Sequence, residues 1–268
     1  MDARLPNEFF DCVVDLLPEQ PKPGSQGGRR RIDNHTVLRV IWFMLTVGCR
    51  WKDVPRELGC SGETARLRLK QWQEAGVWQR VHRRFLEKLN HCGRLNTQVT
   101  IVDSAQVRAF GGGDRTGPSP VNRRKKGSKY TLLVDQNGTP LVMQTVAANM
   151  SDHRQILPTI ADFPQIAGRP GRPRCRPVYL LADAGYDSES TRTVLKLLNI
   201  TPLIRRKKST HGSSLGQIRW VVERTFSWLF GLRRLRIRYD RHPTIVDAWT
   251  CLSMSVICHK ILMRPHAL

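Results

Sequence analysis

Apolar residues recur along this chain with a helical spacing at first and with a strand-like spacing afterwards. Over residues 1–93 they stand three or four positions apart, as at Val37, Ile41 and Leu45, which predicts helices that pack on a shared core. From Val99 onward, short runs rich in β-branched residues alternate with loops and further helical stretches. We therefore predict a helical domain over residues 1–93 and an α/β domain over residues 97–268.

The helical part contains a pattern typical of a helix-turn-helix, near residues 51–78. A short helix is expected over residues 53–58 and a longer one from Ser61 to about residue 74, because Ser61 can cap the second helix. Arg66, Lys70 and Gln73 share one face of the second helix, and such a face fits the major groove of DNA. An ordinary amphipathic helix with a polar outer side is the alternative interpretation.

The second part is predicted to form one mixed sheet flanked by helices. The expected strands are residues 99–103, 130–135, 140–146, 178–182 and 201–204, and the expected helices are residues 152–161, 188–198, 215–230 and 245–262. The residues Asp135-Gln-Asn-Gly138 indicate a hairpin between the second and third strands. Three antiparallel strands followed by parallel strands joined by helices is the order of a ribonuclease-H-like domain.

Two aspartates follow buried strands of this predicted sheet. Asp103 ends the first strand and Asp183 ends the fourth, and in this topology those two strand ends lie side by side. Two carboxylates in contact repel each other, and a divalent cation removes that cost. Oxygen ligands suit Mg²⁺ or Mn²⁺, and two such ions can stabilise both oxygens of a phosphodiester displacement.

A third carboxylate would complete such a site, and Glu223 is our candidate because it neighbours the apolar Val222 on a predicted helix. Glu223 has an alternative role as the partner of Arg219, one helical turn earlier. Asp187 is a rival of Asp183, but it precedes a helix and resembles an N-cap. Asp135 and Asp152 have structural explanations, in the hairpin and at a helix start.

The charge of the chain indicates a polyanionic partner. Lys and Arg number 44 against 22 Asp and Glu, so the formal net charge is +22, and nucleic acid is the commonest partner of such a surface. We therefore expect contacts with double-stranded DNA from the basic runs of the α/β domain. The expected phosphate-binding residues are Arg123, Arg124, Lys125, Lys126, Arg205, Arg206, Lys207, Arg219, Arg233 and Arg234.

Cysteine usage and hydropathy predict a cytoplasmic protein. The seven Cys form no Cys-x-x-Cys pair, so a disulfide framework or a structural zinc site is not expected. The longest apolar run, near residues 37–47, is too short to span a bilayer and contains Arg39. We therefore expect no membrane partner.

Four stretches of the chain resemble the small DDE transposases of bacterial insertion sequences, in the IS-five branch. They are Ile101-Val-Asp103-Ser104 with Val107-Arg108, the basic stretch Thr116–Asp135, Leu181-Ala-Asp183-Ala-Gly-Tyr-Asp187-Ser188, and Arg219-Trp-Val-Val-Glu223-Arg-Thr-Phe. The stretches Arg50–Pro55 and Trp72–Trp78 also resemble the helical DNA-binding region of this branch.

The resemblance implies that Asp103, Asp183 and Glu223 are the metal-binding triad of a transposase that acts on its element's terminal inverted repeats, as a homodimer in the synaptic complex. The sequence departs from the Tyr-x2-Arg-x3-Glu-x6-Lys signature of the family at Gly216 and Phe230. Arg233 or Arg234 is a candidate replacement for the missing Lys. A decayed transposase that only binds DNA, and a nuclease of the same fold without strand transfer, are the alternative functions.

Overall fold

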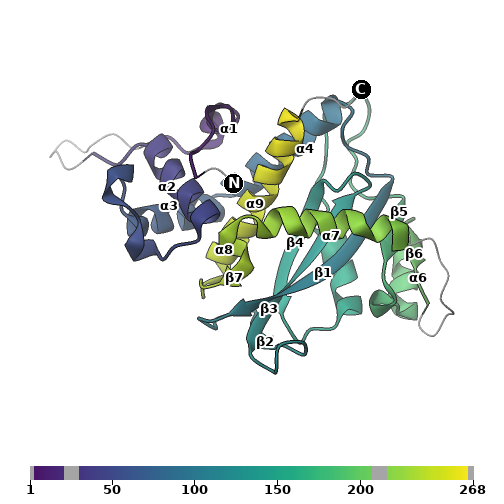
Figure 1. Cartoon of the computed structure of the whole chain (residues 1–268). Helices are drawn as coiled ribbons and strands as arrows, with labels where there is room; N and C mark the ends of the chain where they lie inside the picture. The colour runs from purple at the N-terminus through teal and green to yellow at the C-terminus, as the bar shows by residue number, and fades with distance from the viewer. Residues whose placement is uncertain (1–2, 21–29, 207–215, 265–268) are drawn as a thin grey trace.

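The computed structural model describes residues 3–20, 30–206 and 216–264, with side chains in the last range from residue 220 (Figure 1). Its N-terminal part consists of helices and 3-10 turns. They are α1 (Asn7–Asp11), η1 (Val14–Leu16), α2 (Asn34–Val47), η2 (Trp51–Asp53), η3 (Arg56–Leu58), α3 (Gly62–Glu74) and α4 (Val77–His91). Ser61 caps α3, since its hydroxyl accepts a hydrogen bond from the Thr64 backbone N–H at 3.1 Å, as predicted. A short 3-10 turn at Arg56–Leu58 replaces most of the expected first helix.

A mixed sheet forms the rest of the fold. Its strands are β1 (Val99–Ala109), β2 (Gly117–Pro118), β3 (Lys126–Asp135), β4 (Pro140–Ala147), β5 (Tyr179–Ala182), β6 (Thr201–Ile204) and β7 (Ile237–Arg238). The main strands lie in the order β4-β3-β1-β5-β6, in which β1, β3 and β4 are antiparallel while β1, β5 and β6 are parallel. This is the ribonuclease-H-like topology, so the predicted fold class is confirmed.

Helices cover the sheet and connect it to the N-terminal part (Figure 1). They are η4 (Asp152–Gln155), α5 (Ile156–Ala161), η5 (Ala184–Tyr186), α6 (Glu189–Leu197), α7 (Gly216–Phe230), α8 (Arg233–Arg236) and α9 (Pro243–Met263). α9 packs against α3, α4 and β4. By length and composition it could cross a membrane, but 78% of its most apolar stretch is buried inside the protein. One such buried helix does not indicate a membrane protein.

The first strand is longer than the sequence predicted. We expected β1 to end at Asp103, but it pairs with β3 as far as Arg108. The reason is that buried residues continue beyond Asp103, at Val107 and Ala109, and β3 provides an antiparallel partner along this whole length. Asp103 therefore lies inside a strand, two residues beyond the last β1 residue paired with β5.

The predicted hairpin between β3 and β4 is present and is built on a buried carboxylate. The Asp135 side chain is fully buried and accepts hydrogen bonds from the backbone N–H groups of Asn96, Asn137 and Thr139, at 2.9, 3.0 and 2.6 Å. Burial raises the pKa of Asp135 from 3.8 to about 6 because desolvation outweighs these hydrogen bonds. The structural role expected for Asp135 agrees with this placement.

This carboxyl is expected to make stability depend on pH. Because the folded protein keeps the Asp135 proton to a higher pH than the unfolded chain does, this group lowers the free energy of unfolding as pH rises from 3.8 to about 6. The full change corresponds to about 3 kcal/mol. Urea unfolding at pH 4.5 and 6.5 should therefore show that the stability difference between the native chain and Asp135→Asn is larger at pH 4.5. A difference that does not change with pH would contradict this expectation.

Candidate active site and nucleic-acid interface

The sheet brings Asp103 and Asp183 to the same level on neighbouring parallel strands. The last paired residues of β1 and β5 are Ile101 and Leu181. Asp103 lies two residues further along β1, and Asp183 lies two residues after Leu181 in extended backbone, immediately after the end of β5. Side chains two residues apart in extended chain point to the same face. The two carboxylates therefore extend from the same face of the sheet, where the two strands cease to pair.

That face is the one covered by α7 (Figure 1). In the antiparallel register Asp103 lies opposite Leu132, and Ala105 lies opposite Tyr130, so these side chains share one face. The Tyr130 ring contacts the Phe230 ring of α7, with 6.5 Å between the ring centroids. Asp103 thus points towards the side of the sheet on which α7 lies.

The two aspartates also make matching local contacts. Asp103 Oδ1 accepts a hydrogen bond from the backbone N–H of Ser104 at 2.8 Å, and Asp183 Oδ1 accepts one from Ala184 at 2.7 Å. Both side chains are half-buried. Each carboxylate is thereby oriented by the peptide that follows it and remains accessible from the surface.

Glu223 lies on α7, the helix that covers this face. Its neighbour Val222 is fully buried, whereas Glu223 is exposed. On the opposite flank of the helix, Thr225 Oγ1 donates a hydrogen bond to the Gly138 carbonyl at 2.8 Å, which fixes the rotation of α7 against the β3–β4 turn. Glu223 is therefore displayed at the edge of the helix, as predicted from its position next to Val222.

The donor chemistry of these residues fits a hard divalent cation. Within the described ranges, no three His, Cys, Asp or Glu side chains form a ready-made cluster around one ion, and the strand register brings Asp103 and Asp183 together. Mg²⁺ is commonly held by one or two carboxylates together with water and substrate phosphates. A pair of adjacent, half-exposed carboxylates on a basic protein meets that requirement.

Two other aspartates near this site have different roles. Asp187 Oδ1 accepts a hydrogen bond from Arg192 Nε of α6 at 2.8 Å, and the N-cap of α6 is Ser188, so Asp187 is an ion-pair partner of this helix rather than its N-cap. Asp152, which we expected to cap a helix, is the first residue of η4, and the N-cap position is taken by Ser151. Its carboxylate instead contacts Ser104 of β1 and Lys129 of β3.

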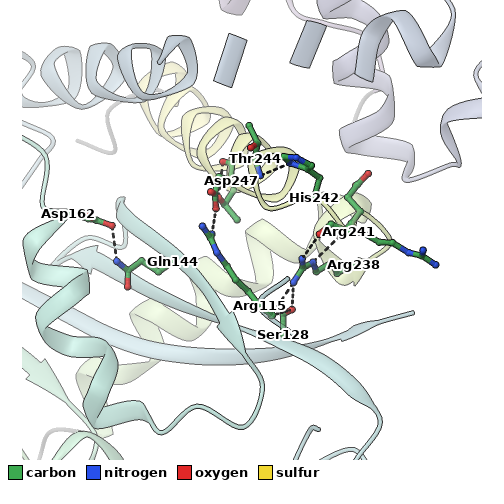
Figure 2. Close-up of polar contacts among 11 residues, drawn as sticks. Arg115, Ser128, Gln144, Asp162, Arg238, Arg241, His242, Thr244 and Asp247 are labelled. Atoms are coloured by element: carbon green, nitrogen blue, oxygen red, sulfur yellow. Dashed lines mark hydrogen bonds and ion pairs between the residues drawn. The ribbon is translucent and has the colours of Figure 1, made fainter. Parts of the chain in front are cut away.

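The basic run at residues 123–126 lies at the surface, where a DNA contact requires it. All four side chains are exposed; the first three residues lie in the connection between β2 and β3, and Lys126 begins β3. Arg123 and Arg124 both have positive φ values, 47° and 56°, which is uncommon for residues with a Cβ atom. Two contacts flank this connection (Figure 2). Arg115, which precedes β2, contacts Asp247 of α9 at 2.5 Å, and Arg238 donates a hydrogen bond to Ser128 of β3.

The other basic residues differ in their availability. Arg205 follows β6, and its backbone N–H approaches the Ala182 carbonyl at 3.5 Å, which places Arg205 beside the strand that carries Asp183. Arg206 and Arg233 are exposed. Lys207 and the side chain of Arg219 lie outside the described residues.

The expectation that Arg234 binds phosphate is wrong, because its side chain is buried. Its side chain is 2% exposed and forms an ion pair with Asp240 at 2.8 Å, and its Nη1 donates a hydrogen bond to the Cys49 carbonyl at 2.7 Å. A guanidinium that is occupied in this way is unavailable to phosphate. Phe230, at the signature Lys position, stacks on Phe226. Arg233 and Arg234 were the two candidate replacements for the missing Lys, and of these two only Arg233 is exposed.

The predicted reading face of α3 is turned partly inward. Arg66 pairs with Glu63 at 2.6 Å and Lys70 pairs with Glu74 at 3.3 Å, both within the helix. Gln73 is half-buried and lines a cavity of about 860 Å³ that α9 also borders. DNA readout by Arg66, Lys70 and Gln73 stays a prediction.

A basic groove that the sequence patterns did not single out lies at the start of α3. This groove has a volume of about 800 Å³ and is bordered by η2, η3 and the first turns of α3. Its basic lining residues are Arg30, Arg31, Lys52, Arg56 and Arg68, against the single acid Glu63. Arg30 and Arg31 belong to the basic run at residues 29–31, but these lining residues are spread over 39 positions of the sequence, so the run did not reveal the groove as a whole.

Comparison with known proteins assigns the chain to a family. A family model described as "Putative transposase of IS4/5 family" matches residues 5–82, and the model "Transposase DDE domain" matches residues 94–257. The chain is 45% identical over 164 residues to the "Putative transposase for insertion sequence element IS402" of Burkholderia cepacia, which covers 61% of this chain and 76% of that protein. It is 39% identical over 116 residues to the "Insertion element IS402 uncharacterized 16.2 kDa protein" of the same organism, covering 42% of this chain and 79% of that protein.

Solved structures with a similar fold include transposases and an integrase. The Mos1 mariner paired-end complex with Mn matches 96% of this chain and 83% of its own chain, with 11% identity and a TM-score of 0.36. The catalytic core of BIV integrase matches 60% of this chain and 83% of its own, with 11% identity and a TM-score of 0.32. Because the DDE domain model spans more than half of the chain, this protein belongs to the DDE transposases of the IS4/5 family, enzymes that cleave DNA and transfer its strands.

Proposed function

We propose that Asp103, Asp183 and Glu223 hold two divalent ions, Mg²⁺ or Mn²⁺, at the α7-covered face of the sheet. The observation that carries this proposal is the register that sets Asp103 and Asp183 level on adjacent parallel strands. Glu223 is the third ligand because α7 packs on the same face and displays it at its edge. The bound ions supply positive charge to the entering and leaving oxygens of a phosphodiester displacement.

The chain's own residues orient the carboxylates and the DNA. Ser104 and Ala184 hold one oxygen of each aspartate through backbone N–H groups, so both carboxylates are oriented before DNA binds. Water adds to the phosphorus at the element end, and the bond from phosphorus to the 3′ oxygen breaks, leaving a 3′-hydroxyl. That hydroxyl then adds to a target phosphorus and loses its proton to solvent, while the bond from this phosphorus to the target's 3′ oxygen breaks and the displaced oxygen takes up a proton from solvent. No side chain becomes covalently attached to DNA.

We further propose how the protein binds double-stranded DNA. The basic groove at the start of α3 contacts phosphates of the terminal inverted repeat, together with Arg66, Lys70 and Gln73. Arg123, Arg124, Lys125, Lys126, Arg205, Arg206, Lys207, Arg219 and Arg233 contact phosphates near the catalytic face. Two copies of the chain join two element ends in the cytoplasm.

The loop arginines are expected to affect the salt dependence of binding. Each phosphate contact that is lost reduces the slope of log affinity against log salt by about 0.9. The variant Arg123→Ser/Arg124→Ser should therefore lower the slope by about 2 when binding is measured between 50 and 200 mM salt. A slope equal to that of the native chain would place these two arginines outside the DNA interface.

The metal site is tested by cleavage of a labelled duplex that carries the end of the protein's own element. Mg²⁺-dependent cleavage that Glu223→Gln abolishes without weakening binding would support the proposed triad. Binding without cleavage by the native chain would favour a decayed DNA-binding protein, and nicks without joined products would favour a nuclease. Cleavage that Glu223→Gln leaves intact would show that the third ligand is a different residue.

A further inference from the structure

A buried lysine paired with a half-buried aspartate lies on the face of the sheet opposite α7. Lys129 belongs to β3 and its side chain is 7% exposed. Its Nζ donates hydrogen bonds to Asp152 Oδ1 and to the Met150 carbonyl, each at 2.7 Å. A charged pair in such a place is weak evidence for stability, because apolar side chains of similar volume often stabilise a core equally well. Its position within the fold is therefore the more informative property.

Asp152 contacts the residue that follows Asp103. Ser104 Oγ donates a hydrogen bond to Asp152 Oδ1 at 2.9 Å, and the backbone N–H of the same Ser104 donates to Asp103 Oδ1 at 2.8 Å. One residue thus joins the carboxylate on the α7 face to the carboxylate on the opposite face. A displacement of Asp152 would be transmitted to Asp103 through a single peptide.

The same carboxylate also faces the turn that follows Asp183. η4, which begins at Asp152, packs against η5, and η5 begins immediately after Asp183. A Cβ atom added to Gly185 would lie 3.6 Å from Asp152 Oδ2, so Oδ2 lies close to this turn. Asp152 therefore accepts a hydrogen bond from the strand that carries Asp103 and lies next to the turn that follows Asp183.

A contact between these strand ends is needed at this point. The pairing of β1 with β5 stops at Ile101 and Leu181, and beyond it two like charges would repel each other until a cation is bound. The direct pairing of β1 with β5 therefore does not extend to Asp103 and Asp183 themselves. Asp152 lies between these two strand ends on the face of the sheet opposite α7, and the ion pair with Lys129 holds its carboxylate there.

We propose that Asp152 and Lys129 are positioning residues that set the separation of Asp103 and Asp183 for divalent-cation binding. This inference rests on the proposed metal site. Residues that orient metal ligands typically change metal affinity by about 10- to 100-fold when they are replaced. The sequence offered one signal for this pair, which is a single Lys among the buried residues of β3.

The test is Mn²⁺ binding to the full-length protein, measured by calorimetry and by electron paramagnetic resonance, with thermal unfolding in parallel. Asp152→Asn keeps the size of the side chain and removes its charge, and Lys129→Met is the second variant. We expect each to weaken Mn²⁺ binding by about tenfold or more. The matched control is Asp162→Asn, because Asp162 accepts a hydrogen bond at 2.7 Å from Gln144 of β4 (Figure 2), and β3 separates that strand from β1. It should change the affinity less than twofold.

The outcomes separate this inference from the function on which it rests. If Asp103→Asn abolishes Mn²⁺ binding while Asp152→Asn lowers only the melting temperature, the pair is structural and the positioning role is wrong. If Asp103→Asn leaves Mn²⁺ binding unchanged, the metal site itself is misplaced and both proposals fail. Weakened Mn²⁺ binding by Asp152→Asn at an unchanged affinity for DNA supports the positioning role.

Discussion

Replacing Asp183 with asparagine is expected to reduce cleavage at the element end about a thousandfold while DNA binding stays unchanged. The amide is nearly isosteric and can still accept the hydrogen bond from the Ala184 backbone N–H, so the fold of the turn is preserved. What it loses is the negative charge and one acceptor oxygen directed at the proposed cations. The loss of one electrostatic contact to a reacting group commonly costs a factor of about 10²–10³, and a lost cation adds to that. The measurement is the single-turnover cleavage rate at saturating Mg²⁺.

Asp187 provides the matched control for this experiment. It lies four residues later, and its carboxylate pairs with Arg192 at 2.8 Å, away from the strand end. Asp187→Asn can still accept a hydrogen bond from Arg192, so we expect a cleavage rate within a few-fold of the native rate. The assignment would be reversed if Asp187→Asn lost cleavage and Asp183→Asn kept it.

The sequence predicted the end of β5 correctly because its signal is local. Residues 178–182 form a short apolar run, and the strand that forms there, Tyr179–Ala182, ends one residue before Asp183. Asp103 was harder to place. Its strand continues to Ala109 because β3 pairs with it over that length, and a partner strand cannot be read from the residues of β1 alone.

Charged residues whose role depends on burial were less predictable. Arg233 and Arg234 are adjacent and chemically identical in the sequence, yet the first is exposed and the second is buried against Asp240. Asp152 resembled a helix cap because it precedes an apolar helix, whereas its actual partners come from β1 and β3. In both cases the deciding contacts are made to other segments of the chain, which composition and spacing do not identify.

Replacing Asp240 with alanine is expected to destabilise the protein more than any other single substitution considered for its structural effect. The Asp240 carboxylate accepts hydrogen bonds from Arg234 and from the indole N–H groups of Trp51 and Trp249, both at 3.0 Å. The Arg234 guanidinium also lies over both indole rings, 5.1 and 5.6 Å from their centroids. Removing one partner of a buried ion pair commonly costs about 3–5 kcal/mol, because the remaining charge is left uncompensated.

These four residues, Trp51, Arg234, Asp240 and Trp249, join the N-terminal helices to α8 and α9. The expected loss should therefore lower the melting temperature of the whole chain by about 10 °C, as measured by calorimetry. Asp53→Ala, which removes an exposed partner of Arg50, should change it by about 1 °C. The double variant Arg234→Met/Asp240→Ala should recover part of the stability lost in Asp240→Ala, because it removes the stranded charge. If the double variant loses more stability than the two single variants lose when their losses are added, the Asp240 ion pair is not the origin of the effect.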